Sequence, residues 1–151
     1  MKILITGTAG FIGYSLANQL LKNKKNTIFG IDNFSTYSGR DIKKLRIDIL
    51  KKFKNFKFYK ININNKKKIE NFFKKNPFDI VVHLAAEVGV RYSIVRPDKY
   101  IKTNISGFFN IIESLKYNEP KKFLFASSSS VYGDCKLFPL KETQNLNPKN
   151  I

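Results

Sequence analysis

The sequence predicts a doubly wound α/β domain with a parallel sheet of about five strands. Two observations predict this class. Short apolar runs alternate with longer amphipathic segments along the chain, and a glycine-rich turn follows the first apolar run. Such alternation is typical of parallel strands joined by right-handed crossover helices. With 151 residues, the chain has the length of one ordinary domain.

The first three expected elements are a strand, a helix and a second strand. Residues 2–6 form an apolar run that ends at a glycine, as a buried parallel strand does. Residues 11–23 predict a helix that ends in a cluster of Asn and Lys, and residues 27–31 predict the second strand. The apolar residues at helical spacing in the first helix are Phe11, Ile12, Leu16, Leu20 and Leu21.

The next elements repeat this order after a loop expected at residues 35–39. Residues 40–54 predict a lysine-rich helix, residues 56–61 a third strand, and residues 66–74 a short helix. The residues expected to face inward are Ile42, Leu45, Ile49 and Leu50 from the first of these helices, and Ile69, Phe72 and Phe73 from the second.

The last elements follow a break at residues 76–78. Residues 79–86 predict a fourth strand and a turn of small residues, and residues 97–117 predict a long helix. Residues 121–127 predict a fifth strand, after which we expect a polar loop with no further helix. The long helix carries apolar or aromatic side chains at Tyr100, Ile101, Ile105, Phe108, Ile111, Ile112 and Leu115.

The net charge of +17 raises the possibility of a nucleic-acid partner. However, the basic residues are 24 Lys and only 4 Arg, although Arg is the residue that base readout favours. Lys, Asn, Ile and Phe, which have A/T-rich codons, supply 72 of the 151 residues. Codon bias therefore explains the charge better than a nucleic-acid partner does, and the lysine runs are expected on solvated helix faces.

The cysteine and histidine counts exclude further classes of site. The single cysteine, Cys135, cannot form an intramolecular disulfide, which fits a cytoplasmic protein. His83 is the only histidine, so we expect no metal site. No apolar run approaches the roughly 18 residues that a membrane span needs, so we expect no membrane association.

The strongest motif follows the first strand and opens the first helix. It reads Gly7-Thr8-Ala9-Gly10-Phe11-Ile12-Gly13, and the carboxylate of Asp32 follows the second strand, 19 residues beyond Gly13. Glycines at such a junction let the backbone approach a pyrophosphate, which the helix N-terminus attracts. A carboxylate after the second strand accepts hydrogen bonds from ribose hydroxyls and repels a 2′-phosphate. The pattern therefore predicts NAD rather than NADP.

Two further motifs end strands at the same predicted edge of the sheet. His83-Leu84-Ala85-Ala86 ends the fourth strand with small residues that leave room for a flat ligand. We interpret His83 as a packed, hydrogen-bonded residue rather than a general base. The serine run 127–130, followed by Val131-Tyr132-Gly133, ends the fifth strand with hydroxyls suited to a substrate.

Together these motifs resemble the extended short-chain dehydrogenase/reductases, and within them the NAD-dependent epimerase/dehydratase group that acts on nucleotide sugars. The resemblance runs from Met1 to Ile151 and implies a Rossmann-like fold. The segment Glu87-Val88-Gly89-Val90-Arg91-Tyr92-Ser93 resembles the UDP-glucuronate 4-epimerase branch. UDP-glucose 4-epimerases and nucleotide-sugar dehydratases remain alternatives.

The resemblance also implies roles for individual residues. Ser128 stands where the family has its catalytic Ser or Thr, and Arg91 and Ser129 would contact the sugar, Arg91 through a carboxylate. Asn62 departs from the acid usual beside adenine. The residues implied in holding NAD are Gly7, Gly10, Phe11, Ile12 and Gly13 at the pyrophosphate, Asp32 and Asn33 at the ribose, Asn62 and Ile63 at adenine, and Leu84, Ala85, Ala86 and Asn104 around the nicotinamide side.

The family's acid–base pair, Tyr-x-x-x-Lys on the helix after the fifth strand, is expected to lie beyond Ile151, together with the sugar-binding part. Residues 1–151 therefore read as an incomplete NAD-binding domain, truncated after strand five. The chain could be part of a longer epimerase, an inactive NAD-binding remnant, or a basic nucleic-acid-binding protein on the same scaffold. The open sheet edge also allows a homodimer.

Overall fold

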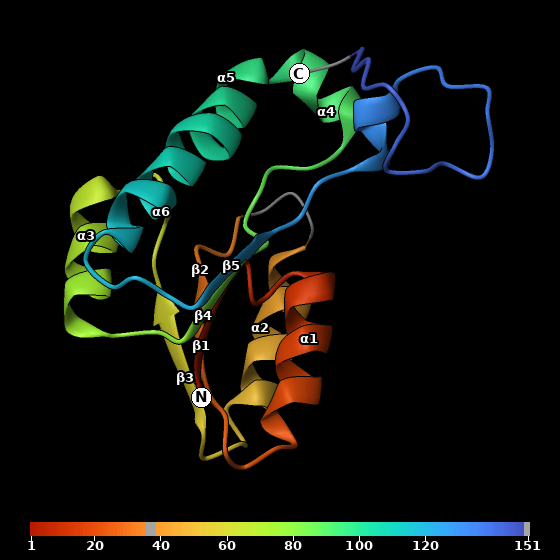
Figure 1. Cartoon of the computed structure of the whole chain (residues 1–151). Coiled ribbons are helices and arrows are strands. Elements are labelled where there is room, and N and C mark those ends of the chain that lie inside the picture. The colour runs from red at the N-terminus through yellow and green to blue at the C-terminus, as the bar shows by residue number, and fades with distance from the viewer. Residues whose placement is uncertain (36–38, 150–151) are drawn as a thin grey trace.

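The computed structural model describes residues 1–35 and 39–149, and its centre is a five-stranded parallel sheet (Figure 1). The strand order is β3-β2-β1-β4-β5, which confirms the predicted doubly wound class. Residues 36–38 of the expected loop at 35–39, and the chain end at 150–151, lie outside the described residues. The strands are β1 (Lys2–Thr6), β2 (Thr27–Asp32), β3 (Phe56–Lys60), β4 (Ile80–His83) and β5 (Lys122–Phe125).

Helices cover the sheet from both sides (Figure 1). Helices α1 (Phe11–Leu21) and α2 (Arg40–Leu50) lie against one face, and α3 (Lys66–Lys75) and α6 (Phe108–Leu115) against the other. In the central strand, Thr6 pairs in register with Ile31 of β2 and His83 of β4. The carboxyl ends of the three strands therefore meet at one edge of the sheet.

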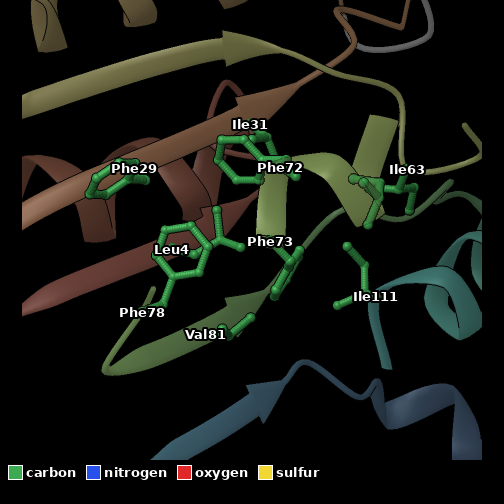
Figure 2. Packing of buried hydrophobic residues seen from close by; sticks show 10 residues of the cluster. Leu4, Phe29, Ile31, Ile63, Phe72, Phe73, Phe78, Val81 and Ile111 are labelled. Atoms are coloured by element: carbon green, nitrogen blue, oxygen red, sulfur yellow. The ribbon is translucent and has the colours of Figure 1, made fainter. Parts of the chain in front are cut away.

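Two hydrophobic clusters fill the layers between the sheet and its helices. One packs Leu4, Phe29 and Ile31 against α3 and α6 (Figure 2), and the other packs Ile3, Ile5 and Ile28 against α1 and α2. Ile69, Phe72 and Phe73 of α3 are all buried, as their spacing predicts. The side chain of Asn65 caps α3 by accepting a hydrogen bond from the backbone N–H of Lys68 at 3.0 Å.

The inward face predicted for the second helix was partly wrong, and the apolar residues at helical spacing in the first helix are not all buried. Phe11 and Ile12 are exposed, and α1 instead buries Gly13, Ala17 and Leu21. Small residues at 13 and 17 let the helix approach the sheet closely, so the flanking large residues turn outward. In α2, Ile42 and Leu45 are exposed, whereas the buried residues are Lys43, Ile47 and Leu50. Helix α2 also ends at Leu50, earlier than expected.

The expected helix 97–117 is continuous but changes its hydrogen-bonding pattern twice. It begins as α5 (Pro97–Tyr100), continues as the π-helix η2 (Ile101–Gly107), and ends as α6. Ile101, Ile105 and Ile112 are exposed, whereas Tyr100 and Ile111 are buried. Two elements had not been predicted, namely the short helix α4 (Val90–Val95) and the 3₁₀ turn η3 (Ser129–Tyr132).

Strand β5 lies at one edge of the sheet and is less covered than the others. Leu124 and Phe125 are half exposed or more, and the chain after η3 extends away from the sheet as a long loop (Figure 1). Within the parts of the chain that the structure describes, no helix is long and apolar enough to cross a membrane.

Candidate functional site

The glycine loop between β1 and α1 lies at the carboxyl edge of the sheet. The backbone N–H of Gly7 donates to the carbonyl of Ile31 at 2.8 Å, and that of Gly10 donates to the carbonyl of Gly7 at 2.9 Å. Gly7 has φ +69°, a conformation that disfavours side chains. A Cβ there would also lie 2.8 Å from the backbone nitrogen of Ala85, so the loop touches the exit of β4 directly.

Gly13 makes the closest approach of the helix to the loop. A Cβ on Gly13 would collide with the carbonyl oxygen of Gly7 and would lie 2.9 Å from Cα of Thr8. Only glycine lets α1 begin this near the strand. The N-terminus of α1, which starts after Gly10, therefore lies at the sheet edge, where its free N–H groups favour an anion.

Asp32 ends β2 and is fixed by backbone donors on both carboxylate oxygens. Ala9 donates its N–H to Oδ2 at 3.1 Å, and Phe34 donates its N–H to Oδ1 at 2.7 Å. The bond from Ala9 ties the carboxylate to the glycine loop. Each oxygen retains a second acceptor position, so the group can still accept hydroxyl donors.

Thr6 and His83 connect the ends of β1 and β4. The Thr6 hydroxyl oxygen lies 2.8 Å from Nδ1 of His83 and accepts hydrogen bonds from the backbone N–H groups of Leu84 and Ala85. The imidazole is buried, packs on the Phe108 ring with centroids 5.3 Å apart, and has its pKa lowered to about 4 by that burial. His83 is thus the packed, hydrogen-bonded residue that the sequence indicated.

The predicted adenine residues lie in the loop after β3. Asn62 is exposed, and its Oδ1 accepts a hydrogen bond from the N–H of Asn64 at 2.9 Å, whereas the side chain of Ile63 is buried in the core. An open cavity of about 430 Å³ adjoins this loop, and its lining residues are Asn62, Asn64, Asn65, Lys66, Lys67 and Lys102.

Asn104 contacts the loop after β4 through both ends of its amide. Its Oδ1 accepts from the N–H of Glu87 at 2.8 Å, and its Nδ2 donates to the carbonyl of Glu87 at 3.0 Å. Leu84 and Ala85 are half-buried and Ala86 is exposed, directly before this loop.

Asn33, which follows β2, is half-buried, and its Oδ1 accepts a hydrogen bond from the N–H of Ser35.

The predicted substrate residues are exposed and lie on two separate elements. Arg91 lies on α4, whereas Ser128 caps η3 by accepting a hydrogen bond from the N–H of Ser130 at 3.2 Å. Ser129 is the first residue of η3.

The Tyr-x-x-x-Lys spacing itself occurs twice, at Tyr117–Lys121 and at Tyr132–Lys136. Neither copy lies on one helix. Tyr117 follows the end of α6 and is separated from Lys121 by Pro120, and Tyr132 is followed by Gly133 with φ +57°. Neither spacing therefore places both side chains on one helical face.

Three polar residues that shape this edge had not been predicted from the sequence. Thr6 fixes the β4 exit, Arg46 donates to the carbonyl of Ala9 at 3.2 Å, and buried Lys43 donates to Ser35 at 3.1 Å and 3.2 Å. Lys43 and Arg46 stand at helical spacing from Ile47 and Leu50, and this spacing was the signal in the sequence that they share one face of α2.

Among residues 1–35 and 39–149, no three His, Cys, Asp or Glu are grouped so that they could hold a metal.

The parallel sheet and the glycine loop together define a Rossmann-like domain. The chain belongs to the family described as GDP-mannose 4,6 dehydratase, whose model matches residues 4–151. A UDP-glucuronate 4-epimerase of Thermodesulfobacterium geofontis is 41% identical over 129 residues, which are 85% of this chain and 40% of that protein. Protein CapI of Staphylococcus aureus is 41% identical over 146 residues, which are 97% of this chain and 43% of that protein.

Solved epimerases share this fold closely. The UDP-glucuronic acid 4-epimerase of Bacillus cereus, in complex with UDP-glucuronic acid and NAD, matches with a TM-score of 0.91 and 35% identity. That match covers 99% of this chain and 47% of the epimerase chain. The chain thus spans less than half the length of these relatives and matches their amino-terminal, Rossmann-like portion.

Proposed function

We propose that the chain binds NAD and forms the cofactor-binding part of a UDP-glucuronate 4-epimerase. The observation that carries this proposal is the glycine loop. A Cβ at Gly7 would lie 2.8 Å from the backbone nitrogen of Ala85, and a Cβ at Gly13 would collide with the backbone of the loop itself. Asp32 is hydrogen-bonded to the same loop through the N–H of Ala9. A helix N-terminus suits a pyrophosphate, and a carboxylate at the end of β2 suits ribose hydroxyls.

The proposed cofactor residues divide by the part of NAD that they would hold. The loop from Gly7 to Gly13, including Gly10, Phe11 and Ile12, would hold the pyrophosphate, and Asp32 with Asn33 would hold the adenosine ribose. The exposed Asn62 and the backbone of Ile63, whose side chain is buried in the core, would face adenine. Leu84, Ala85 and Ala86, with Asn104 bracing the loop, would border the nicotinamide. Bound NAD would supply the hydride acceptor and donor that inversion at C4 of a sugar requires.

The proposed substrate is UDP-glucuronate, and this choice rests on α4 and on the relatives. Arg91 is an exposed guanidinium that can bind a sugar carboxylate with two parallel hydrogen bonds. Ser128 and Ser129 would offer hydroxyls to the sugar. UDP-glucose 4-epimerase activity is the second candidate, since a UDP-Glc/GlcNAc 4-epimerase of Campylobacter jejuni also matches, with a TM-score of 0.87 and 34% identity.

Titration calorimetry with NAD tests the cofactor assignment. Asp32→Asn keeps the shape of the side chain but removes its charge, and we expect NAD affinity to fall about tenfold or more because a charge-assisted hydrogen bond contributes about 1.5–3 kcal/mol. Asp79→Asn is the matched control, because Asp79 also accepts a backbone N–H, from Lys2 at 2.8 Å, at the opposite end of the sheet. Equal NAD affinity for the unaltered chain and Asp32→Asn would contradict the ribose assignment.

Residues 1–151 alone are expected to show no conversion of UDP-glucuronate. Neither Tyr-x-x-x-Lys spacing lies on a helix, so neither places a phenol and an amine side by side for proton transfer at the sugar hydroxyl. Incubation with NAD and UDP-glucuronate, followed by chromatography of the nucleotide sugars, measures this directly. Turnover that survives substitution of Tyr132 by Phe would show that another group acts as the base.

Two further proposals concern location and assembly. A cytoplasmic location is supported by the free Cys135, since oxidising compartments favour paired cysteines.

Self-association is supported by exposed Leu124 and Phe125 on the edge strand β5. Sedimentation of the unaltered chain and of Leu124→Lys tests whether β5 joins two copies.

A further inference from the structure

We propose that Asn110 and Gly107 are positioning residues that hold the β3–α3 loop, residues 61–65, at the cofactor edge. This inference rests on the proposed NAD binding and deepens it. The loop carries Asn62 and follows the strand next to Asp32, and the π-helix η2 with α6 lies against it. Asn110 and Gly107 belong to that helix and lie far from the loop in sequence.

Asn110 makes the polar contact. Its Nδ2 donates to the carbonyl of Ile63 at 2.9 Å, and both residues are more than nine-tenths buried. A buried amide costs free energy unless it is hydrogen-bonded, whereas an apolar residue would fill the same space without that requirement. The directional bond therefore fixes the backbone of the loop in a way that packing alone would not.

Gly107 makes the close contact. A Cβ at this position would lie 2.7 Å from Oδ1 of Asn64 and 2.8 Å from Cδ1 and Cγ1 of Ile63. In the same segment, Thr103 accepts a hydrogen bond from Nδ2 of Asn64 at 3.2 Å. The helix therefore holds two consecutive loop residues, Ile63 and Asn64. Gly107 packs against both of them, Asn110 is hydrogen-bonded to Ile63, and Thr103 is hydrogen-bonded to Asn64.

This anchoring determines which groups the loop presents at the sheet edge. The side chain of Ile63 is committed to the core, so the exposed Asn62 amide is left at the surface. The loop is also joined to the ribose side, because Ile61 donates its N–H to the carbonyl of Asp32 at 3.2 Å. Asn62 and Asp32 are the two residues expected to contact the adenine and the ribose of the adenosine. Displacement of Ile63 would therefore move Asn62 relative to Asp32.

The test compares NAD with its deamino analogue, in which hypoxanthine replaces adenine. We expect the unaltered chain to prefer NAD, because in the proposed binding mode the loop would face the purine edge where the two bases differ. Asn110→Asp removes the donor and places a carboxylate against a carbonyl, so we expect the preference to shrink about threefold to tenfold, the worth of a typical hydrogen bond. Gly107→Ala is an independent second variant that displaces the loop by contact.

Asn118→Asp is the matched control. Asn118 donates its Nδ2 to the carbonyl of Asn76 at 3.2 Å, so it also joins the end of this helix to a loop, but away from the sheet edge that carries Asp32. Both Asp variants should lower the melting temperature, yet only Asn110→Asp should change the preference for NAD. An unchanged preference in Asn110→Asp and Gly107→Ala, with NAD still bound, overturns the positioning role and leaves the proposed function standing. Failure of the unaltered chain to bind NAD overturns both.

Discussion

The Thr6 hydroxyl oxygen lies 2.8 Å from Nδ1 of His83 and also accepts two backbone N–H groups, from Leu84 at 3.1 Å and Ala85 at 3.0 Å. With both lone pairs of the hydroxyl occupied, its single proton is directed at Nδ1. The ring is then neutral and carries its own proton on Nε2. One hydroxyl thus fixes both the β4 exit and the tautomer of the only histidine in the chain.

This arrangement makes stability depend on pH between about 4 and 6.5. Burial lowers the pKa of His83 to about 4, whereas the unfolded chain titrates near 6.5. Between these values the unfolded state binds more protons, so the free energy of unfolding falls as the pH falls through this range and is undiminished above it. We expect a loss of about 2.5 kcal/mol by pH 4.5, measured by urea unfolding.

His83→Gln provides the control for that titration, because glutamine carries no titrating group while carboxylates contribute equally in both proteins. The stability difference between the unaltered chain and His83→Gln should shrink on acidification from pH 7.5 to pH 4.5. A difference that is independent of pH would show that His83 titrates normally in the folded state.

Thr6→Val tests the hydroxyl itself. The substitution preserves the shape of the side chain but removes the hydroxyl that accepts from the Ala85 N–H, whereas the Leu84 N–H keeps its bond to the Thr6 carbonyl at 3.3 Å. We therefore expect a loss of about 1 to 3 kcal/mol in urea unfolding. Thr6→Ser keeps the acceptor and should lose much less. Equal stability of the Val and Ser variants would contradict this assignment.

Gly13→Ala tests the close approach of α1 to the glycine loop. Alanine favours a helix interior by about 1 kcal/mol over glycine, yet its Cβ would collide with the backbone of Gly7 and Thr8. We expect lower stability and loss of NAD binding, measured by thermal unfolding and calorimetry. Ser15→Ala, on the exposed side of the same helix, should leave NAD binding intact.

The positive charge is expected to give no nucleic-acid binding at physiological salt. Only 4 of the 28 basic residues are Arg, and base readout and bidentate phosphate contacts favour Arg over Lys. Anisotropy with labelled single- and double-stranded DNA and RNA measures this directly. Retained binding with a steep salt dependence would favour the nucleic-acid alternative.

The order of the elements could be predicted because burial on both faces of a parallel sheet leaves uninterrupted apolar runs, as in β1 and β2. The inward face of α2 could not, because Lys43 buries its stem and reaches Ser35 with its ammonium group, while Ile42 and Leu45 face outward. The π-helix η2 packs closely on Ile63 and Asn64, which are remote in sequence, so no local pattern could predict that contact.

The candidate site shows the same division. Gly7, Gly13 and Asp32 follow a local pattern that the sequence displays directly. The role of Thr6 depends on its register opposite His83, a pairing between residues 77 positions apart. Likewise, helix α4 follows a loop in which the carbonyls of Val88 and Gly89 accept hydrogen bonds from the Tyr100 hydroxyl. No local sequence pattern predicts that contact.

The solitary imidazole also has a practical consequence. His83 is the only histidine and lies between Thr6 and the Phe108 ring, next to the strand end that leads into Leu84. Its two carbon-bound ring protons therefore give the only imidazole signals of the chain in an NMR spectrum. A molecule that settles against Leu84 and Ala85 would perturb those signals without any label having been introduced. The chain thus carries its own spectroscopic reporter of occupancy at the edge of the sheet.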